Sequence, residues 1–335
     1  MTGTVVGSGV GGSVGVAAET AFGTWVTPAK WLEYESEAIK WNPSRTTGKG
    51  IRNGGLVPRR SARQTTTATV AGALVTPVYG KGMGLFLANL MGSQAVAPVV
   101  QGATVAYLQT HALARQDGQS LSLQIGRPTM DGVLHPYNYK GLKIIKGQFE
   151  AKVNEALRAT FDFDGKDYDE VGVYGTPVYQ TANPYFAWEQ GVFSMGTFGA
   201  EVPVSGVRGW TLTIDRPSKT DNFYLDGTGR KGAQVQNDFM KISGALETDF
   251  LSKTTFADLF AADTPQSMIV TFTGPLIAGA FSQQITFRLP SVQWDDEPPT
   301  MGGPDIIQPK MTFTVNDDDT NVPATITYMS TDVTL

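Results

Sequence analysis

The chain has 335 residues, enough for one large domain or two of average size, and its 26 basic and 31 acidic residues give a net charge of −5. It contains no cysteine, which excludes disulfides, thiolate metal sites and cysteine nucleophiles, and its two histidines exclude a histidine-rich metal site. The mild acidity argues against a dedicated duplex-binding protein, which needs a basic surplus to neutralise phosphates.

Residues 1–24 open the chain with a glycine-rich stretch. Gly7, Gly9 and Gly12 have the G-x-G-x-x-G spacing of a dinucleotide-binding turn, but no helix-forming stretch follows to face a pyrophosphate. The pattern instead predicts a flexible arm that orders against a neighbouring subunit. The segment lacks the basic start and apolar core of a signal peptide, and no run reaches the ~18 apolar residues of a membrane span. We therefore expect a soluble, non-secreted chain without a membrane partner.

Ser44–Gln64 is the most basic stretch, with six cationic residues and no acidic one: Arg45, Lys49, Arg52, Arg59, Arg60 and Arg63. Three interpretations are open. A nucleic-acid surface would interleave aromatic residues for base stacking, and this stretch has none. A solvated mobile loop is the second. The third is a contact loop that meets acidic surface on another subunit, for which arginine suits bidentate pairing with carboxylates.

Strand patterns dominate the remainder. Apolar and polar residues alternate in "RATFDFDG" (158–165), "GWTLTID" (209–215) and several later stretches, as half-buried strands require. Two stretches have helical spacing instead, 80–92 and 253–263; in the first, Met83, Phe86, Leu87 and Leu90 form one apolar stripe. Abundant glycine and proline and a low charged fraction agree with a mostly β chain with many turns.

Two similar heptapeptides point to an internal duplication. "VAGALVT" (Val70–Thr76) and "ISGALET" (Ile242–Thr248) are each followed by one of the two predicted helices. Upstream, "NPSRT" at 42–46 matches "RPSKT" at 216–220; downstream, Ala159–Asp167 matches Ala324–Asp332 at an offset of 165. The common order predicts two domain-sized repeats, A at 25–170 and B at 185–335, joined by a linker at 171–184.

Nothing in the sequence marks a catalytic, cofactor or metal site. The acidic runs Phe161–Glu170 and Asn316–Thr320 lack the ligand order of a calcium loop, so solvated carboxylates are expected, with Asp162 and Asp164 on the outward face of a strand. His111 and His135 lie beside no nucleophile motif and are expected to be ordinary surface or loop residues. The chain is not expected to be an enzyme.

A family resemblance extends over the first ~165 residues. "ETAFGT" (Glu19–Thr24), the arginine-rich loop "GGLVPRRSARQ", "VAGALVTPVYGKGMGLFLANLMG" and "GLKIIKGQFEAKVNEALRATFDFDGKD" follow one another in an order that resembles the major tail tube proteins of long-tailed (siphovirus-type) bacteriophages. The resemblance implies a structural virion protein, made in the bacterial host cytoplasm. It also favours the contact-loop interpretation of Ser44–Gln64, with the partner on the adjacent ring.

The expected fold is mostly β with two short helices, arranged as two tandem β-sandwich-like tail-tube domains whose strands join an inter-subunit barrel. The family implies stacked rings that form a conduit for the genome and the tape-measure protein, with other tail proteins at the tube ends. If each repeat is one tube domain, three chains make a pseudo-sixfold ring, which we favour over a hexamer with repeat B outside. The lumen is expected to be polar and on balance acidic.

Two other functions stay open. A non-tubular tail-end connector or adhesion component of the virion would share this composition. A carbohydrate-binding module would show clustered surface tryptophans, which the sequence lacks.

Overall fold

The chain folds mainly into antiparallel strands, as its composition predicts. The computed structural model describes residues 6–93, 97–116, 120–169, 173–250, 252–296, 303–304 and 306–335. Two α-helices lie in this part, α1 Gly84–Met91 and α2 Lys253–Ala261, and two short 3-10 helices, η1 Arg60–Ala62 and η2 Trp188–Gln190. Both α-helices fall within the predicted stretches.

The strands divide into those before and after residue 170. The first group is β1 Ser13–Ala18, β2 Lys30–Leu32, β3 Ser36–Glu37, β4 Lys40–Thr47, β5 Arg63–Pro77, β6 Val99–Val100, β7 Tyr107–Ala112, β8 Leu121–Pro128, β9 Leu134–Lys152, β10 Arg158–Gly165 and β11 Asp167–Asp169. The second group is β12 Gly191–Gly196, β13 Val202–Pro203, β14 Val207–Asp215, β15 Ser218–Lys219, β16 Val235–Gln236, β17 Lys241–Thr248, β18 Gln266–Ala278, β19 Phe281–Trp294, β20 Lys310–Val315 and β21 Thr325–Ser330.

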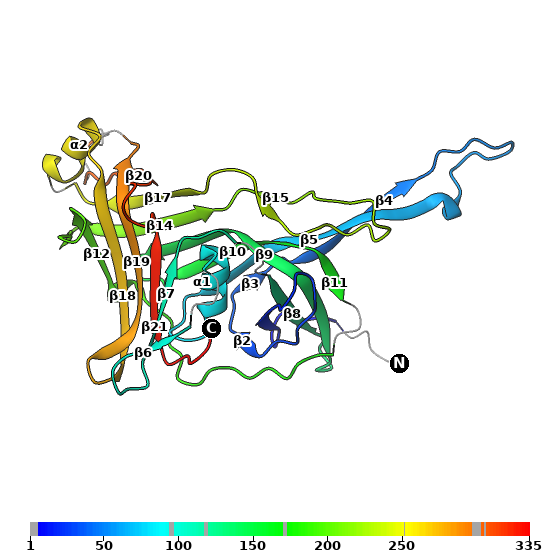
Figure 1. Ribbon diagram of the computed structural model, residues 1–335, viewed down its shortest axis with the longest axis horizontal. Helices are drawn as coiled ribbons and strands as arrows, with labels where there is room; N and C mark the ends of the chain where they lie inside the picture. Colours follow the sequence, from blue (N-terminus) through cyan, green and yellow to red (C-terminus); the bar gives the residue numbers. More distant parts are fainter. Residues whose placement is uncertain are drawn as a thin grey trace.

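A continuous antiparallel wall runs through both groups in the order β4–β5–β10–β9–β14–β17–β20. The two groups join at β9 and β14, which pair from Gly209↔Lys152 to Asp215↔Lys146. The chain therefore already contains one lateral joint between two similar sheet units (Figure 1).

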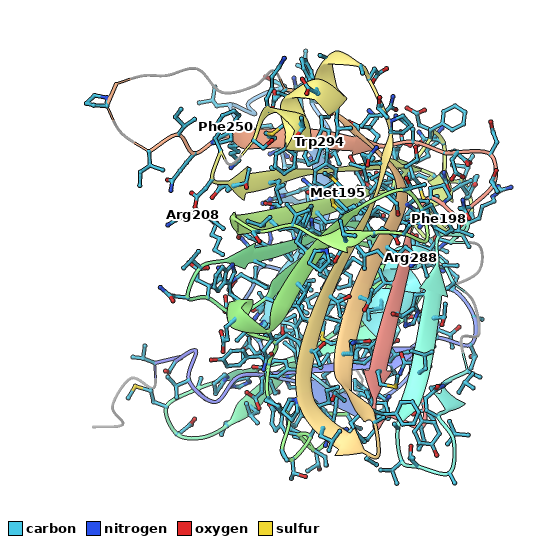
Figure 2. The ribbon with its side chains drawn as sticks, turned by 90° about the vertical axis from the view of Figure 1, so that its left-hand side faces the viewer. Met195, Phe198, Arg208, Phe250, Arg288 and Trp294 are labelled. Atoms are coloured by element: carbon cyan, nitrogen blue, oxygen red, sulfur yellow. The ribbon has the colours of Figure 1, made fainter. Side chains whose placement is uncertain are left out.

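Two long strands link this wall to side sheets. The first part of β9 pairs with β8 and β11 and its second part with β10 and β14; β8 continues to β1 and β2. Likewise β19 pairs with β18 and β21 and then, over Val292–Trp294, with β20. Figure 2 shows β18, β19, β21 and β7 side by side, so a strand from the first group completes the second side sheet.

The core is continuous across the joint. Ala159, Phe161 and Phe163 of β10 are buried while Thr160 and Asp162 stay partly exposed, which confirms the predicted alternation. Aromatic rings link the two groups, with Phe149 and Phe287 at 4.8 Å between centroids and Trp210 and Phe287 at 5.0 Å.

Helix α1 is more deeply buried than its sequence suggests. The sequence predicts a single apolar stripe, but all eight residues are buried, and three strands, β1, β7 and β9, contact the helix. Its one amide side chain, Asn89, accepts hydrogen bonds from the Ile144 backbone N–H at 2.8 Å and from Gln116 Nε2 at 2.9 Å. These bonds tie the helix to β9.

The two heptapeptides occupy equivalent strands, β5 and β17. Gly72 of the first pairs with Phe163 of β10, and Gly244 of the second pairs with Phe313 of β20. Strand β20 therefore holds the position of β10. The sequence match of Ala159–Asp167 with Ala324–Asp332 was wrong, because β21 pairs instead with β19 and β7. Alternation fixes which face of a strand is buried and leaves its partners undetermined.

The expected flexible arm is shorter than residues 1–24. Ser13–Ala18 form β1, which pairs with β2 on one edge and with β8 on the other, and Val14 and Val16 are fully buried. Gly15 is required there, because an added Cβ would lie 2.7 Å from the Pro28 ring. This part of the predicted flexible arm is therefore a closely packed strand.

Candidate assembly surfaces

A long hairpin made of β4, β5 and the loop between them projects away from the body of the molecule (Figure 1). We call Ser44–Gln64, its outer part, the basic hairpin. All six predicted contact residues lie here and are exposed: Arg45, Lys49, Arg52, Arg59, Arg60 and Arg63. Within the described residues none of them forms an ion pair.

Apolar side chains accompany these cations. Ile51 and Leu56 are 103% and 100% exposed, and Val57 is 76% exposed. Apolar residues gathered on one projecting element can form an exposed patch, and such patches mark contact sites. Strand β4 also leaves one edge without a strand partner in the described part of the chain. Both features are typical of a surface that contacts another chain.

The corresponding hairpin between β14 and β17 does not project. Its residues 216–240, which we call the docked hairpin, lie across the first group of strands. Arg230 Nε donates to Asp167 Oδ2 at 2.7 Å, and the Arg230 guanidinium lies 6.0 Å from the Trp41 ring. Lys231, 1% exposed, forms an ion pair with Asp164. The docked hairpin thus brings two cations onto two carboxylates of the first group.

Asp164 therefore differs from its prediction as a solvated carboxylate. It is buried beneath the docked hairpin, where Gln234 Nε2 also donates to its Oδ2 at 2.7 Å. Burial raises the pKa of Asp164 and lowers the pKa of Lys231, and their mutual attraction opposes both shifts.

Arg216 anchors the start of the docked hairpin, and sequence reasoning missed this residue. Its guanidinium is 2% exposed and donates to the carbonyl oxygens of Leu90 at 2.8 Å and Ala114 at 2.7 Å. A cation at the C-terminal end of α1 complements the helix dipole. The only sequence signal was an arginine directly after an apolar strand and before a proline, which does not reveal burial.

Carboxylates follow two neighbouring strands of the second group, β19 and β20. We call Asp295, Asp296 and Asp317–Asp319 the acidic strip. Asp295 and Asp296 accept hydrogen bonds from the Thr314 and Thr312 hydroxyls at 2.7 and 2.6 Å. Asp317–Asp319 lie in the connection after β20, in which Asp318 Oδ1 accepts from the Asn321 N–H at 2.6 Å. Among the described residues, none of the five carboxylates has a cationic partner.

The solvent-facing side of the wall alternates in charge. Asp162 is opposite Lys146, Lys146 is opposite Asp215, and Asp215 is opposite Lys241 across successive strands. Further along, Lys310 lies 3.2 Å from Glu247. Between these rows runs an uncharged row: Thr160, Gln148, Thr213, Ser243 and Thr314. This face is polar and nearly balanced in charge.

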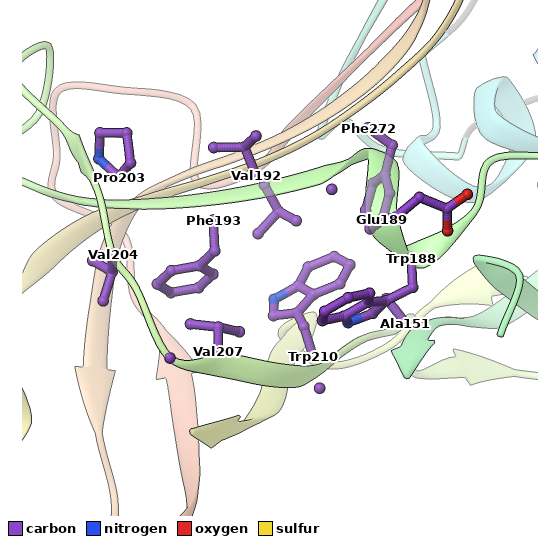
Figure 3. A pocket seen from close by; sticks show the side chains of 14 residues that line it. Ala151, Trp188, Glu189, Val192, Phe193, Pro203, Val204, Val207, Trp210 and Phe272 are labelled. Atoms are coloured by element: carbon purple, nitrogen blue, oxygen red, sulfur yellow. The ribbon is translucent and has the colours of Figure 1, made fainter. Parts of the chain in front are cut away.

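An apolar groove of about 330 Å³ lies between η2, β12 and β14 (Figure 3). Its walls include Trp188, Val192, Phe193 and Trp210, and Glu189 is its one charged residue. Trp188 Nε1 donates to the Arg208 carbonyl oxygen at 3.0 Å, so that polar group is already satisfied. A small-molecule site needs several convergent polar groups, which this groove does not offer.

The histidines do not assemble a catalytic group. His111 differs from its prediction as a surface or loop residue: it is fully buried in β7, with Nδ1 3.2 Å from Ser93 Oγ and Nε2 3.2 Å from Gln109 Oε1. His135 is exposed on β9. In the described ranges, no group of three or more His, Asp or Glu residues is arranged to hold a metal ion. Among the helices of these ranges, none has the apolar length that a membrane span requires.

In the part of the chain that the structure describes, β4 has a free edge, and the basic hairpin and the acidic strip have no ionic partner. These features are typical of a β-rich structural protein that contacts other chains. The family model of the phage tail tube proteins matches residues 9–328, so the chain belongs to the phage tail tube protein family. It is a structural, non-enzymatic component of the phage tail tube, located in the tail of the virion. A comparison with curated protein sequences found no match.

Proposed function

We propose that this chain polymerises as stacked rings into the tail tube of a long-tailed, siphovirus-type phage, a conduit for the genome and the tape-measure protein. The observation that carries this proposal is the wall itself. It passes from one sheet unit to the next through β9 and β14 and, among the described residues, leaves β4 with a free edge. Adding the next chain at that edge repeats a joint the molecule already makes and removes the edge.

An internal duplication underlies this joint in our proposal. Repeat A (25–170), together with β1 that precedes it, and repeat B (185–335) share one order of pairing. In this order β1, β4, β5, α1, β8, β9 and β10 are matched by β12, β14, β17, α2, β18, β19 and β20. The repeats are not separate bodies, because β7 of the first pairs with β21 of the second.

Three chains then supply six sheet units to a pseudo-sixfold ring. Every second lateral joint then lies within one polypeptide chain, as the β9–β14 joint does. Because the two sheet units of a chain cannot separate, the effective concentration of sheet units during ring closure is higher than for separate domains. The competing hexamer leaves repeat B outside the inner barrel. Placement of β14 and β17 in the same wall as β5 and β10 supports the trimer. Other tail proteins would cover the open ends of the tube.

The polar face of the wall is our candidate for the lumen lining. Opposite charges alternate on it, from Asp162 and Lys146 to Glu247 and Lys310. This assignment does not support the expected net acidic lining. Phosphates would meet hydroxyls and cations that lie opposite carboxylates, and a face of balanced charge has no excess of cations to release counterions from DNA.

Electron microscopy of the purified, concentrated chain tests the proposal. Hollow tubes or stacked rings are expected, and reconstruction of a single ring should show three chains with both repeats on the inner barrel. Persistent monomers would contradict the tube and favour a tail-end connector or adhesion component. Six chains per ring, with repeat B off the barrel, would overturn the trimer.

A further inference from the structure

We propose that the basic hairpin of each chain docks onto the second repeat of the neighbouring chain in the same ring, with its arginines against the acidic strip. This inference rests on the proposed assembly into rings and names the partner surface of the basic hairpin. It replaces the adjacent ring, which the sequence alone favoured, with the lateral neighbour.

The contact of the docked hairpin within one chain indicates how the basic hairpin contacts the neighbouring chain. It belongs to repeat B, and it crosses the wall of repeat A next to the β9–β14 joint. Backbone contact supports it as well, because the Ala68 N–H donates to the Gly229 carbonyl oxygen at 3.2 Å. If the joint between chains repeats the joint within the chain, the hairpin of repeat A crosses the wall of the neighbour's repeat B in the same way.

Positions within the two hairpins correspond. Arg59 precedes Gly72 by the same number of residues as Lys231 precedes Gly244, and these two glycines are equivalent in their strands. Arg59 therefore holds the place of Lys231, the buried cation of the docked hairpin. Arg60 follows it directly, and Arg63 is the first residue of β5.

Positions on the receiving surface correspond too. Asp167 follows the end of β10 by two residues, and Asp317 follows the end of β20 by two residues. Asp164 corresponds to Thr314, whose hydroxyl is bound by the carboxylate of Asp295. Asp167 thus has an acidic counterpart in Asp317, and the position equivalent to Asp164 has the carboxylate of Asp295 beside it.

Charge complementarity supports the same pairing. The basic hairpin has six exposed cations and the acidic strip five carboxylates, and within the described residues neither set has an ionic partner. In Figure 1 the hairpin projects on one side of the molecule and β20 lies on the opposite side, so the two surfaces cannot meet within one chain. A head-to-tail neighbour brings them together.

Site-specific cross-linking tests which neighbour is contacted. Because the chain has no native cysteine, only the introduced thiols can react. The double variant Arg59→Cys/Asp317→Cys is assembled and treated with a short bismaleimide. We expect denaturing gels to show dimers and then a ladder that stops at the number of chains in one ring. A ladder that continues well beyond one ring would place the contact between rings and overturn the proposal.

Matched controls separate this inference from the proposed function. Arg59→Cys/Asp226→Cys carries its second thiol on the docked hairpin, away from the acidic strip. This variant should give no ladder of cross-linked chains. Tubes from the wild-type chain test the assembly itself. If tubes form but Arg59→Cys/Asp317→Cys yields no cross-link, the docking inference fails while the tube proposal stands.

A charge exchange provides a second measurement. Arg59→Glu/Arg60→Glu/Arg63→Glu should reduce the tube yield at least tenfold, as should Asp317→Lys/Asp318→Lys/Asp319→Lys. Combining the two sets in one chain should restore most of the yield, because every lateral contact then has opposite charges again. If each triple variant lowers the tube yield and the combined variant does not restore it, direct pairing of the two surfaces is contradicted.

Discussion

At the scale of single residues, the structure concentrates its unusual environments where the two repeats meet. Asp164, Arg216 and Lys231 are charged and buried, and each contacts the other repeat. Removing one partner of such a contact leaves the other buried without compensation, which costs more than the contact contributes. His111 also lies where the two repeats meet, because its strand, β7 of the first repeat, pairs with β21 of the second.

The buried His111 makes stability depend on pH. Burial lowers its pKa from 6.5 to about 4. The unfolded chain therefore binds a proton first as the pH falls, so stability is complete above pH 6.5 and is lost progressively down to about pH 4. The expected loss is about 3 kcal/mol. Urea unfolding of unassembled subunits across this range measures it, and His111→Gln should flatten the wild-type curve. An equally steep curve in that variant would show that other groups are responsible.

At the scale of elements, helix α1 depends on a residue from the other repeat. The helix ends at Gly92, whose φ of 73° suits glycine and whose missing side chain leaves room for the Arg216 guanidinium, 2.9 Å from where a Cβ would be. Arg216 in turn satisfies two carbonyl groups at this end of the helix. A helix of the first repeat is thus completed by the start of the docked hairpin.

Replacing that arginine should destabilise the subunit. Arg216→Met keeps much of the side-chain volume but leaves the Leu90 and Ala114 carbonyls without their charged donor, so we expect a loss of about 3 kcal/mol. Arg208→Met is the matched control: its side chain is half-exposed and 3.7 Å from Asp249, and the loss should be below about 0.5 kcal/mol. Equal urea midpoints for the two variants would contradict the role given to Arg216.

At the scale of the whole molecule, the repeats form one folding unit. Phe149 of β9 packs on Phe287 of β19, and Trp210 of β14 packs on the same ring. The C-terminal segment also returns to the first repeat, where Asp332 Oδ2 accepts from the Gly82 N–H at 2.7 Å. Neither repeat buries its core without the other.

The unassembled subunit should therefore unfold in a single transition. Calorimetric and van't Hoff enthalpies are expected to agree, and Phe149→Ala should lower the free energy of unfolding by about 3–5 kcal/mol without splitting the transition. Differential scanning calorimetry measures both quantities. Two resolved transitions in the wild-type subunit would mean that the repeats fold independently.

The sequence by itself determined the mostly β class, both α-helices and the family. These rest on local signals: alternation at 158–165, helical spacing at 80–92, and motif order. It also located the six cations of the basic hairpin, because an uninterrupted run of one charge sign is visible without a fold.

Only the tertiary structure decided which strands pair and which polar groups are buried. Strand β20, rather than β21, lies beside β17, and the presumed arm at Ser13–Ala18 is a core strand. Asp164 and His111 look like solvated residues until strands and hairpins distant in sequence cover them. Local patterns specify a strand and its buried face. Its partners depend on contacts between residues far apart in the chain, which no short window of sequence contains.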